Sequence, residues 1–98
     1  MIPILFEANA KNFDTYGIGV LKDATSCEIT EERNGPYELT LKYPINGSFY
    51  AFIKKERIIV AKPNDLAKNQ AFRIYKISIP INGIITVNAT HISYDLVA

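Results

Sequence analysis

The chain contains 98 residues, of which 48% are hydrophobic and 21% are charged, and its formal net charge is +1. This length is too short for two domains with separate cores, and the composition disfavours a disordered chain. The near-neutral charge weighs against nucleic-acid binding driven by a positive surface, and the single cysteine excludes an internal disulfide framework.

The hydrophobic residues are of the kinds that favour β-structure. The chain has 15 isoleucines against 6 leucines, together with 6 tyrosines and 5 phenylalanines. β-Branched and aromatic side chains fit a pleated sheet better than a helix, in which they lose χ1 freedom. We therefore predict one mainly β domain over residues 1–98. It is a small antiparallel barrel or sandwich of about six short strands, with at most one or two short helical turns.

The first part of the chain predicts a strand followed by a loop. Residues 2–6 are apolar and form the opening strand, which Pro3 confines to a sheet edge or to a strand start. This segment lacks the basic start and the long apolar core of a secretory signal. Residues 14–19 form a loop that leads to Val20 and Leu21.

The Asn-Gly pair at positions 34 and 35 predicts the first hairpin. A three-residue loop, Arg33-Asn34-Gly35, separates an apolar face from a polar face, which a two-residue loop does not. We predict a type I turn with Gly35 left-handed in a G1 bulge. The predicted pairs are Ile29 with Leu39, Cys27 with Leu41, Glu28 with Thr40, and Ser26 with Lys42.

The Asn-Gly pair at positions 82 and 83 predicts the last hairpin by the same reasoning, with Ile81-Asn82-Gly83 as its loop. The predicted pairs are Ile79 with Ile85, Ile77 with Val87, Tyr75 with Ala89, and Arg73 with His91. The hairpin lies within the longest uncharged stretch, residues 77–94. Because Pro80 and two asparagines interrupt that stretch, we do not expect a membrane span.

The middle of the chain predicts one clear strand and two uncertain segments. Residues 57–61 form an apolar run of strand length. A turn at 63–65 follows, and residues 66–69 form a loop or one helical turn. Residues 48–54 fit a helical turn through Phe49, Phe52 and Ile53, but Tyr50 and Phe52 also fit a strand.

A nucleophile is the first kind of chemistry to consider. Cys27 alternates with Ile29 on the apolar face, so we expect a buried hydrophobic residue and not a nucleophile. His91 is the only histidine, which excludes a two-histidine metal site. A Cys27–His91 catalytic pair stays open as a minor alternative, although the hairpins place the two residues in different surroundings.

Charged clusters are the other candidates. Glu28, Glu31, Glu32 and Glu38 could serve glycoside hydrolysis or bind Ca²⁺, but we expect a solvated strand face. Residues 54–57 could contact a phosphate, but Glu56 interrupts them and we expect a charged loop. Gly17-Ile18-Gly19 lacks the remainder of a phosphate loop. We predict no catalytic, cofactor-binding or metal-binding residues and no cofactor.

Several segments, taken together in their order and spacing, resemble the N-terminal region of phage minor structural proteins. That family includes the tail-associated lysins and the prophage endopeptidase tail proteins of phages infecting Gram-positive bacteria. The resemblance covers nearly the whole chain. It is carried by residues 2–6, 17–21 with Asp23-Ala24, 30–35 leading to 37–39, Pro44, 70–75 and 89–96.

The resemblance implies a structural role at a phage or prophage tail tip. Family members are similar to the baseplate hub of contractile tails and form homotrimers that close the tail tube and join it to the host-facing apparatus. It implies other tail proteins as partners, the tail tube and the distal tail protein among them. It also implies synthesis in the bacterial host cytoplasm before assembly into the virion.

The resemblance also bears on domain organisation and activity. Longer members carry a peptidoglycan-cleaving domain, and nothing in these 98 residues matches it. We therefore expect an N-terminal domain of a longer protein, non-enzymatic in this piece. The mixed pattern at residues 71–74 indicates a strand covered on both faces, one of them by a neighbouring subunit as a hypothesis.

Two functions of other classes remain as alternatives. The first is a small β-barrel that binds a cell-wall saccharide or nucleic acid, which requires exposed aromatic residues grouped on one sheet face. Tyr37 and Tyr43 share a face with leucines, which favours the core instead. The second is a cell-wall hydrolase, which requires two convergent carboxylates or a Cys–His pair.

Overall fold

The computed structural model describes residues 3–10, 17–31, 37–61 and 70–92. Seven strands and one 3₁₀ turn follow one another along these ranges. They are β1 (Ile4–Phe6), β2 (Gly19–Val20), β3 (Ser26–Glu31), β4 (Tyr37–Pro44), η1 (Tyr50–Phe52), β5 (Ile58–Ala61), β6 (Gln70–Ile77) and β7 (Ile84–His91).

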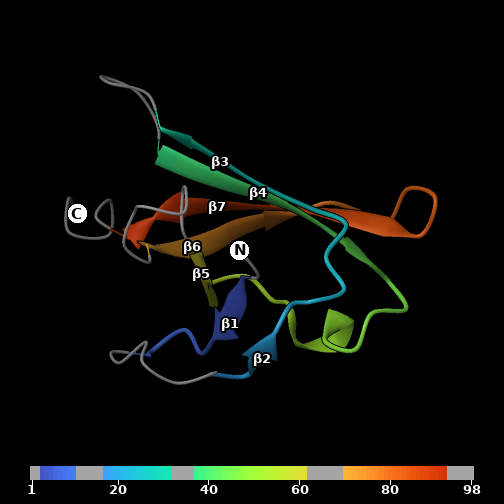
Figure 1. The fold of residues 1–98 in the computed structure, drawn as a ribbon, viewed down its shortest axis with the longest axis horizontal. Coiled ribbons are helices and arrows are strands. Elements are labelled where there is room, and N and C mark those ends of the chain that lie inside the picture. The colour runs from blue at the N-terminus through green and yellow to red at the C-terminus, as the bar shows by residue number, and fades with distance from the viewer. Residues whose placement is uncertain (1–2, 11–16, 32–36, 62–69, 93–98) are drawn as a thin grey trace.

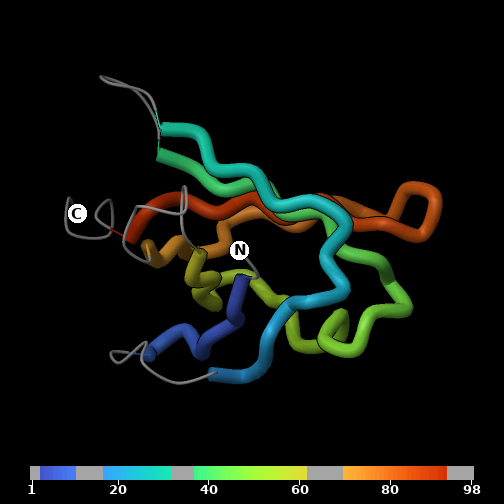
Figure 2. The backbone as a smooth tube through the Cα atoms, in the orientation of Figure 1, coloured from blue at the N-terminus to red at the C-terminus, as the bar shows by residue number. Residues whose placement is uncertain are grey.

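The strands of the described residues form one antiparallel sheet in the order β2-β1-β5-β6-β7-β4-β3. The sheet curls into a half-barrel (Figure 1). Figure 2 shows the backbone passing directly from the edge strand β2 to the opposite edge strand β3, a crossing made by residues 21–25. The prediction of a mainly β, barrel-like antiparallel fold is confirmed. The described residues contain seven strands instead of about six.

One face of the sheet carries the main hydrophobic core. Leu39 and Leu41 of β4 lie on it beside Val87 of β7 and Phe72 of β6, and all four are fully buried. Alternate residues of a strand point to the same face, so the buried positions recur with a period of two. Burial of each such side chain stabilises the fold by about 1.5–3 kcal/mol. Leu21, from the crossing between the two edge strands, joins the same core.

The opposite face of β1, β5 and β6 is buried as well. Phe6, Ile58, Val60 and Ala71 form a second apolar cluster there. Because both faces of β5 are covered, all four of its residues are buried, as is typical of a central strand. The expectation that both faces are covered near Ala71 is confirmed. Ala10 and Ile92 of the same chain pack against this cluster, so no neighbouring subunit is needed to cover it.

The predicted register of the first hairpin is confirmed. Cys27 pairs with Leu41 and Ile29 with Leu39, and the polar pairs between them also match. The register continues to Glu31 opposite Tyr37. The proposed loop, Arg33-Asn34-Gly35, lies outside the described residues.

The last hairpin differs from the prediction at its turn. Ile81 and Ile84 exchange backbone hydrogen bonds of 3.0 and 3.1 Å, so the loop contains two residues and not three. Asn82 and Gly83 both adopt positive φ, 54° and 77°, the pattern of a type I′ turn. The left-handed Gly83 is confirmed, but the three-residue loop Ile81-Asn82-Gly83 is wrong.

The register of this hairpin also shifts along its length. Ile77 pairs with Val87 as predicted, but Ile74 pairs with Ala89 and Phe72 with His91. The predicted pairs of Tyr75 with Ala89 and Arg73 with His91 are therefore wrong. A bulge between Ile74 and Lys76 inserts Tyr75 as an extra residue. The bulge lets Phe72, Ile74 and Ile77 share the core face, which an unbroken alternation would forbid.

The remaining segments resolve two of the open alternatives. Residues 50–52 form the 3₁₀ turn η1, so the helical alternative for this region holds. Pro3 precedes β1, which pairs on both sides with β2 and β5, so the proline stands at a strand start. The expected turn at 63–65 and loop at 66–69 lie outside the described residues. Among the residues that are described, no helix has the length and apolarity to span a membrane.

Candidate functional site

Cys27 and His91, the candidate catalytic pair, lie far apart in the sheet. Cys27 pairs with Leu41, which in turn pairs with Val87 of β7. His91 lies four residues beyond Val87, a distance of about 13 Å along the strand. Burial raises the pKa of the Cys27 thiol, which is the reverse of what an activated nucleophile needs. The structure does not bring the two residues together.

His91 belongs instead to an aromatic cluster at one end of the sheet. Its ring stacks on Tyr37 with centroids 4.6 Å apart, and the ring of Phe72 is perpendicular to both, with centroid distances of 5.3 Å to Tyr37 and 5.4 Å to His91. The Nε2 atom of His91 lies 2.6 Å from Oε1 of Gln70. The amide oxygen accepts a hydrogen bond from the Nε2–H group. Burial lowers the pKa of His91, with the charge of Glu31 acting in the opposite direction. The imidazole is therefore a packed member of the aromatic cluster.

The acidic candidates do not converge. Glu28 and Glu31 are exposed along β3, at different positions of the edge strand. Glu38 accepts a hydrogen bond of 3.2 Å from the hydroxyl group of Tyr75, whose side chain comes from the bulge in β6. Glu32 lies outside the described residues. Within the described ranges, no three His, Cys, Asp or Glu side chains are grouped so that they could hold a metal ion.

The basic segment at 54–57 forms a tight turn before β5. The amide of Arg57 donates a 3.3 Å hydrogen bond to the carbonyl group of Lys54, and Glu56 has a φ of 76°. The amide of Glu56 donates to Ile74 of β6 at 2.8 Å, so the left-handed residue is held against the sheet. Lys54 and Lys55 remain exposed, as expected for a charged loop.

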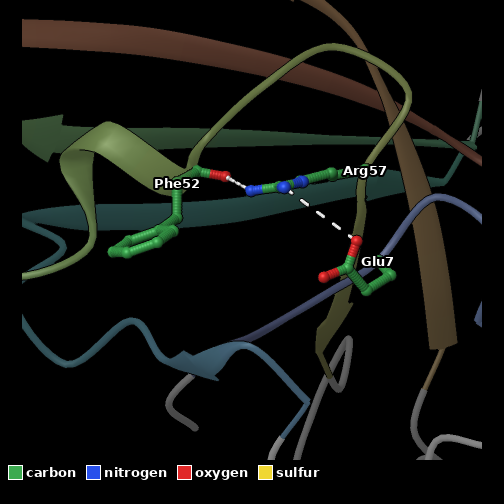
Figure 3. Close-up of polar contacts among 3 residues, drawn as sticks. All are labelled: Glu7, Phe52 and Arg57. Carbon is green, nitrogen blue, oxygen red and sulfur yellow. Dashed lines mark hydrogen bonds and ion pairs between the residues drawn. The ribbon is translucent and has the colours of Figure 1, made fainter.

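Two arginines brace the loops around this turn. Arg57 donates from Nη1 to the carbonyl group of Phe52 at 2.5 Å, and its Nη2 lies 3.9 Å from a carboxylate oxygen of Glu7 (Figure 3). Arg73 donates from Nη1 to the carbonyl groups of Ala8 at 2.9 Å and of Glu56 at 2.6 Å. The segment after β1 is thereby tied to the turn before β5. This role could not be predicted from the sequence, because the contacts join segments that are distant along the chain.

Gly19, in the Gly17-Ile18-Gly19 segment, allows close packing. A Cβ atom at Gly19 would lie 2.2 Å from the ring of Phe49, so the aromatic ring occupies the space that a side chain would need. Phe49 belongs to the loop before η1. The glycine therefore lets this loop pack on the edge strand β2.

A polar contact joins the crossing segment to the loop after β4. The carboxylate of Asp23 accepts a 2.9 Å hydrogen bond from the amide of Ser48 and a 3.3 Å bond from the hydroxyl group of Tyr43. The same hydroxyl oxygen accepts a bond of 3.0 Å from the amide of Phe49. The backbone hydrogen bond from Ser48 is the main reason why the pKa of Asp23 is lowered. This contact fixes the loop that follows β4.

Exposed apolar side chains gather at one end of the β6–β7 hairpin. Ile79 and Ile81 are exposed there, and Ile45, which follows β4, is exposed beside them. The sequence prediction placed Ile79 opposite Ile85 on the core face and so missed this surface. The signal that could have revealed it is Pro80, because a proline between two isoleucines interrupts strand pairing.

Comparison with known proteins gives one family. A family model described as the prophage endopeptidase tail N-terminal domain matches residues 6–91. No curated protein and no solved structure matches the chain.

Proposed function

Because this chain belongs to the family of prophage endopeptidase tail N-terminal domains, we propose that it is a structural module of a phage tail tip. It resembles a baseplate hub and assembles the tail tube to the host-facing apparatus. The match over residues 6–91 carries this proposal, since it extends from the end of β1 to the end of β7. A structural role in a phage tail is what membership of the family supports.

The polar contacts of the described residues suit such a role. Asp23 holds the loop at Ser48, Arg57 holds the carbonyl group of Phe52, and Arg73 holds that of Ala8. Each contact joins one loop to another part of the sheet, and a module that sets the position of its neighbours needs rigid joints of this kind. We propose that these residues are non-catalytic and that any peptidoglycan cleavage belongs to a separate domain.

The assembly follows from the same proposal. The chain acts as the N-terminal β domain of a longer tail-tip protein, made in the cytoplasm of the bacterial host. The full-length protein forms a homotrimer and contacts the tail tube and the distal tail protein. Nucleic acid is not among its partners.

The experiment that tests this proposal examines the phage particle. We expect mass spectrometry of purified tails to detect the chain, and gold-labelled antibody to mark the tail tip in electron micrographs. Native mass spectrometry of the full-length protein is expected to give a trimer. Absence of the chain from the tails, or labelling along the shaft alone, would contradict the proposal.

The saccharide- or nucleic-acid-binding alternative has less support. Phe52 and Tyr75 are exposed, but they come from η1 and from the bulge in β6. Tyr43 is buried, and Tyr37 stacks on His91. We expect no binding of the purified chain on a glycan array and no salt-dependent binding of DNA or RNA. A zymogram on bacterial cell walls is expected to stay blank, and clearing would contradict the non-catalytic role.

A further inference from the structure

The distal end of the β6–β7 hairpin exposes more apolar surface than the fold requires. Ile79 is 80% exposed, Ile81 67% and Ile45 44%. Figure 1 shows the hairpin extending beyond the other strands at this end of the molecule. We call residues 78–84 together with Ile45 the hairpin tip. A concentrated exposed apolar patch on a folded domain is a mark of an interaction site.

The hairpin tip is held in one conformation by backbone hydrogen bonds. Ile81 and Ile84 bond to each other in both directions, and the amide of Ile45 donates to the carbonyl group of Gly83 at 2.9 Å. Ser78 and Thr86 make two further bonds, of 2.9 Å between their backbones and 2.8 Å from the Thr86 amide to the Ser78 hydroxyl. A surface that is already ordered loses little conformational entropy when a partner binds.

The charged residue that lines the hairpin tip is a lysine. Lys42 lines a shallow depression of about 290 Å³ with Ile81 and Ile84. Lys76 lies on the same face of the sheet as Lys42. Their partners, Asn88 and Thr86, are two residues apart on β7 and therefore point to the same side. Glu28 of β3 also lies on this face, in the same cross-strand row as Lys76, because its partner Thr40 pairs with Asn88. The carboxylate of Asp23, nearby in the crossing segment, is bonded to Ser48 and Tyr43.

We infer that the hairpin tip is an anchor for a different tail protein, one that presents an apolar groove bordered by Asp or Glu side chains. This inference rests on the proposed function and names the chemistry of one partner. The isoleucines enter the groove, and Lys42 and Lys76 meet the carboxylates at its rim. A second copy docked tip to tip would place its Lys42 near the Lys42 of the first copy, and this like-charge contact disfavours self-association.

The test uses the full-length protein in assembled phage tails. A photo-crosslinking residue at position 81 is expected to crosslink to another tail protein, at a peptide rich in Asp or Glu. The same residue at position 52, where Phe52 is 47% exposed on η1, is the matched control and is expected to give no crosslink to that peptide. No crosslink from position 81, or a crosslink to a second copy of this chain, would overturn the inference.

Variants measure the contribution of the apolar and charged parts separately. The double variant Ile79→Ser/Ile81→Ser is expected to lower incorporation into tails about tenfold or more, as loss of interface anchors does. Lys42→Glu/Lys76→Glu is expected to do the same, whereas Lys54→Glu/Lys55→Glu and Phe52→Ser are expected to leave incorporation unchanged. Normal incorporation of both tip variants would overturn the inference, as would equal losses in the controls.

Two further measurements keep the outcomes distinct. All four variants change exposed side chains, so their melting temperatures are expected to match that of the parent protein. If the isoleucine variant has a lower melting temperature than the parent protein, the incorporation of the lysine variant alone tests the inference. If the parent protein is present in tails but gives no crosslink from position 81, the anchor is refuted and the tail-tip role still stands. The parent protein absent from tails refutes both.

Discussion

The hydroxyl group of Tyr43 lies 3.3 Å from the carboxylate of Asp23 and donates a hydrogen bond to it, across 20 positions of sequence. The side chain of Tyr43 is fully buried in the core. Asp23 belongs to the segment that crosses from one edge of the sheet to the other. The bond therefore ties the crossing to β4. Through the amides of Ser48 and Phe49, it also fixes the loop that precedes η1.

Replacement of Tyr43 by Phe removes only this hydroxyl group. We expect the free energy of unfolding to fall by about 1–2 kcal/mol, because the amide of Phe49 loses its acceptor and Asp23 loses a donor. Urea denaturation followed by circular dichroism measures the change. Tyr75→Phe is the matched control, since the Tyr75 hydroxyl bonds to Glu38 at an exposed site, and it is expected to cost less. Equal stability of Tyr43→Phe and the parent protein would argue that the contact is weak.

Gly47→Ala tests how closely the loop packs on the same tyrosine. A Cβ atom at position 47 would lie 2.4 Å from the ring of Tyr43, which is buried and has no room to move away. We expect a loss of about 1–3 kcal/mol, typical of overpacking, measured as a drop in the urea midpoint. Gly83→Asn is the control. Position 83 has open space, and asparagine tolerates its positive φ. A larger loss at Gly83 than at Gly47 would contradict the packing argument.

Glu56→Gly is expected to stabilise the protein. Glu56 adopts a φ of 76°, which costs a residue with a side chain about 1–2 kcal/mol. Glycine removes this strain and keeps both backbone bonds of residue 56, at an entropic cost of about 0.5–1 kcal/mol. The net gain should appear as a higher melting temperature in calorimetry. Lys55→Gly, at a neighbouring residue without positive φ, is expected to give no gain, and a gain there equal to that of Glu56→Gly would contradict the strain argument.

The stability of the protein is expected to fall in mild acid because of His91. Burial lowers the pKa of His91 in the folded state below its ordinary value of 6.5, so the unfolded chain binds the proton more readily. Stability from this residue is present above pH 6.5 and is lost as the pH falls toward and through the folded pKa. Melting temperatures measured from pH 7.5 to pH 5 are expected to decline, and less so in His91→Gln.

Asp23 provides the control for that titration. Its pKa is lowered from the ordinary value of 3.8, so its contribution is present above that value and is lost only in stronger acid. Asp23→Asn is expected to keep the decline between pH 7.5 and pH 5. A pH profile of His91→Gln that matches the parent protein would show that another group titrates in this range.

The two hairpins differ in how much of their pairing could be predicted from the sequence. For the first, the alternation around Cys27 and Ile29 predicted every pair from Ser26 to Ile29 correctly. For the last, the same reasoning predicted Ile77 opposite Val87 but failed at Tyr75 and at the turn. An unbroken alternation cannot reveal a bulge, because an extra residue changes which face each later side chain occupies. The exposure of Ile79 was missed because the predicted three-residue loop paired it with Ile85 on the core face.

The composition and the alternation of apolar residues determined the β class, the first register and the buried state of residues such as Leu39, because these depend on neighbours along one strand. The tertiary structure alone decided the strand order, the crossing from β2 to β3, the bulge at Tyr75 and the braces made by Arg57 and Arg73. Those features depend on which distant segments meet and on how a curled sheet fits its side chains into a shared core. No local pattern of residues carries that information.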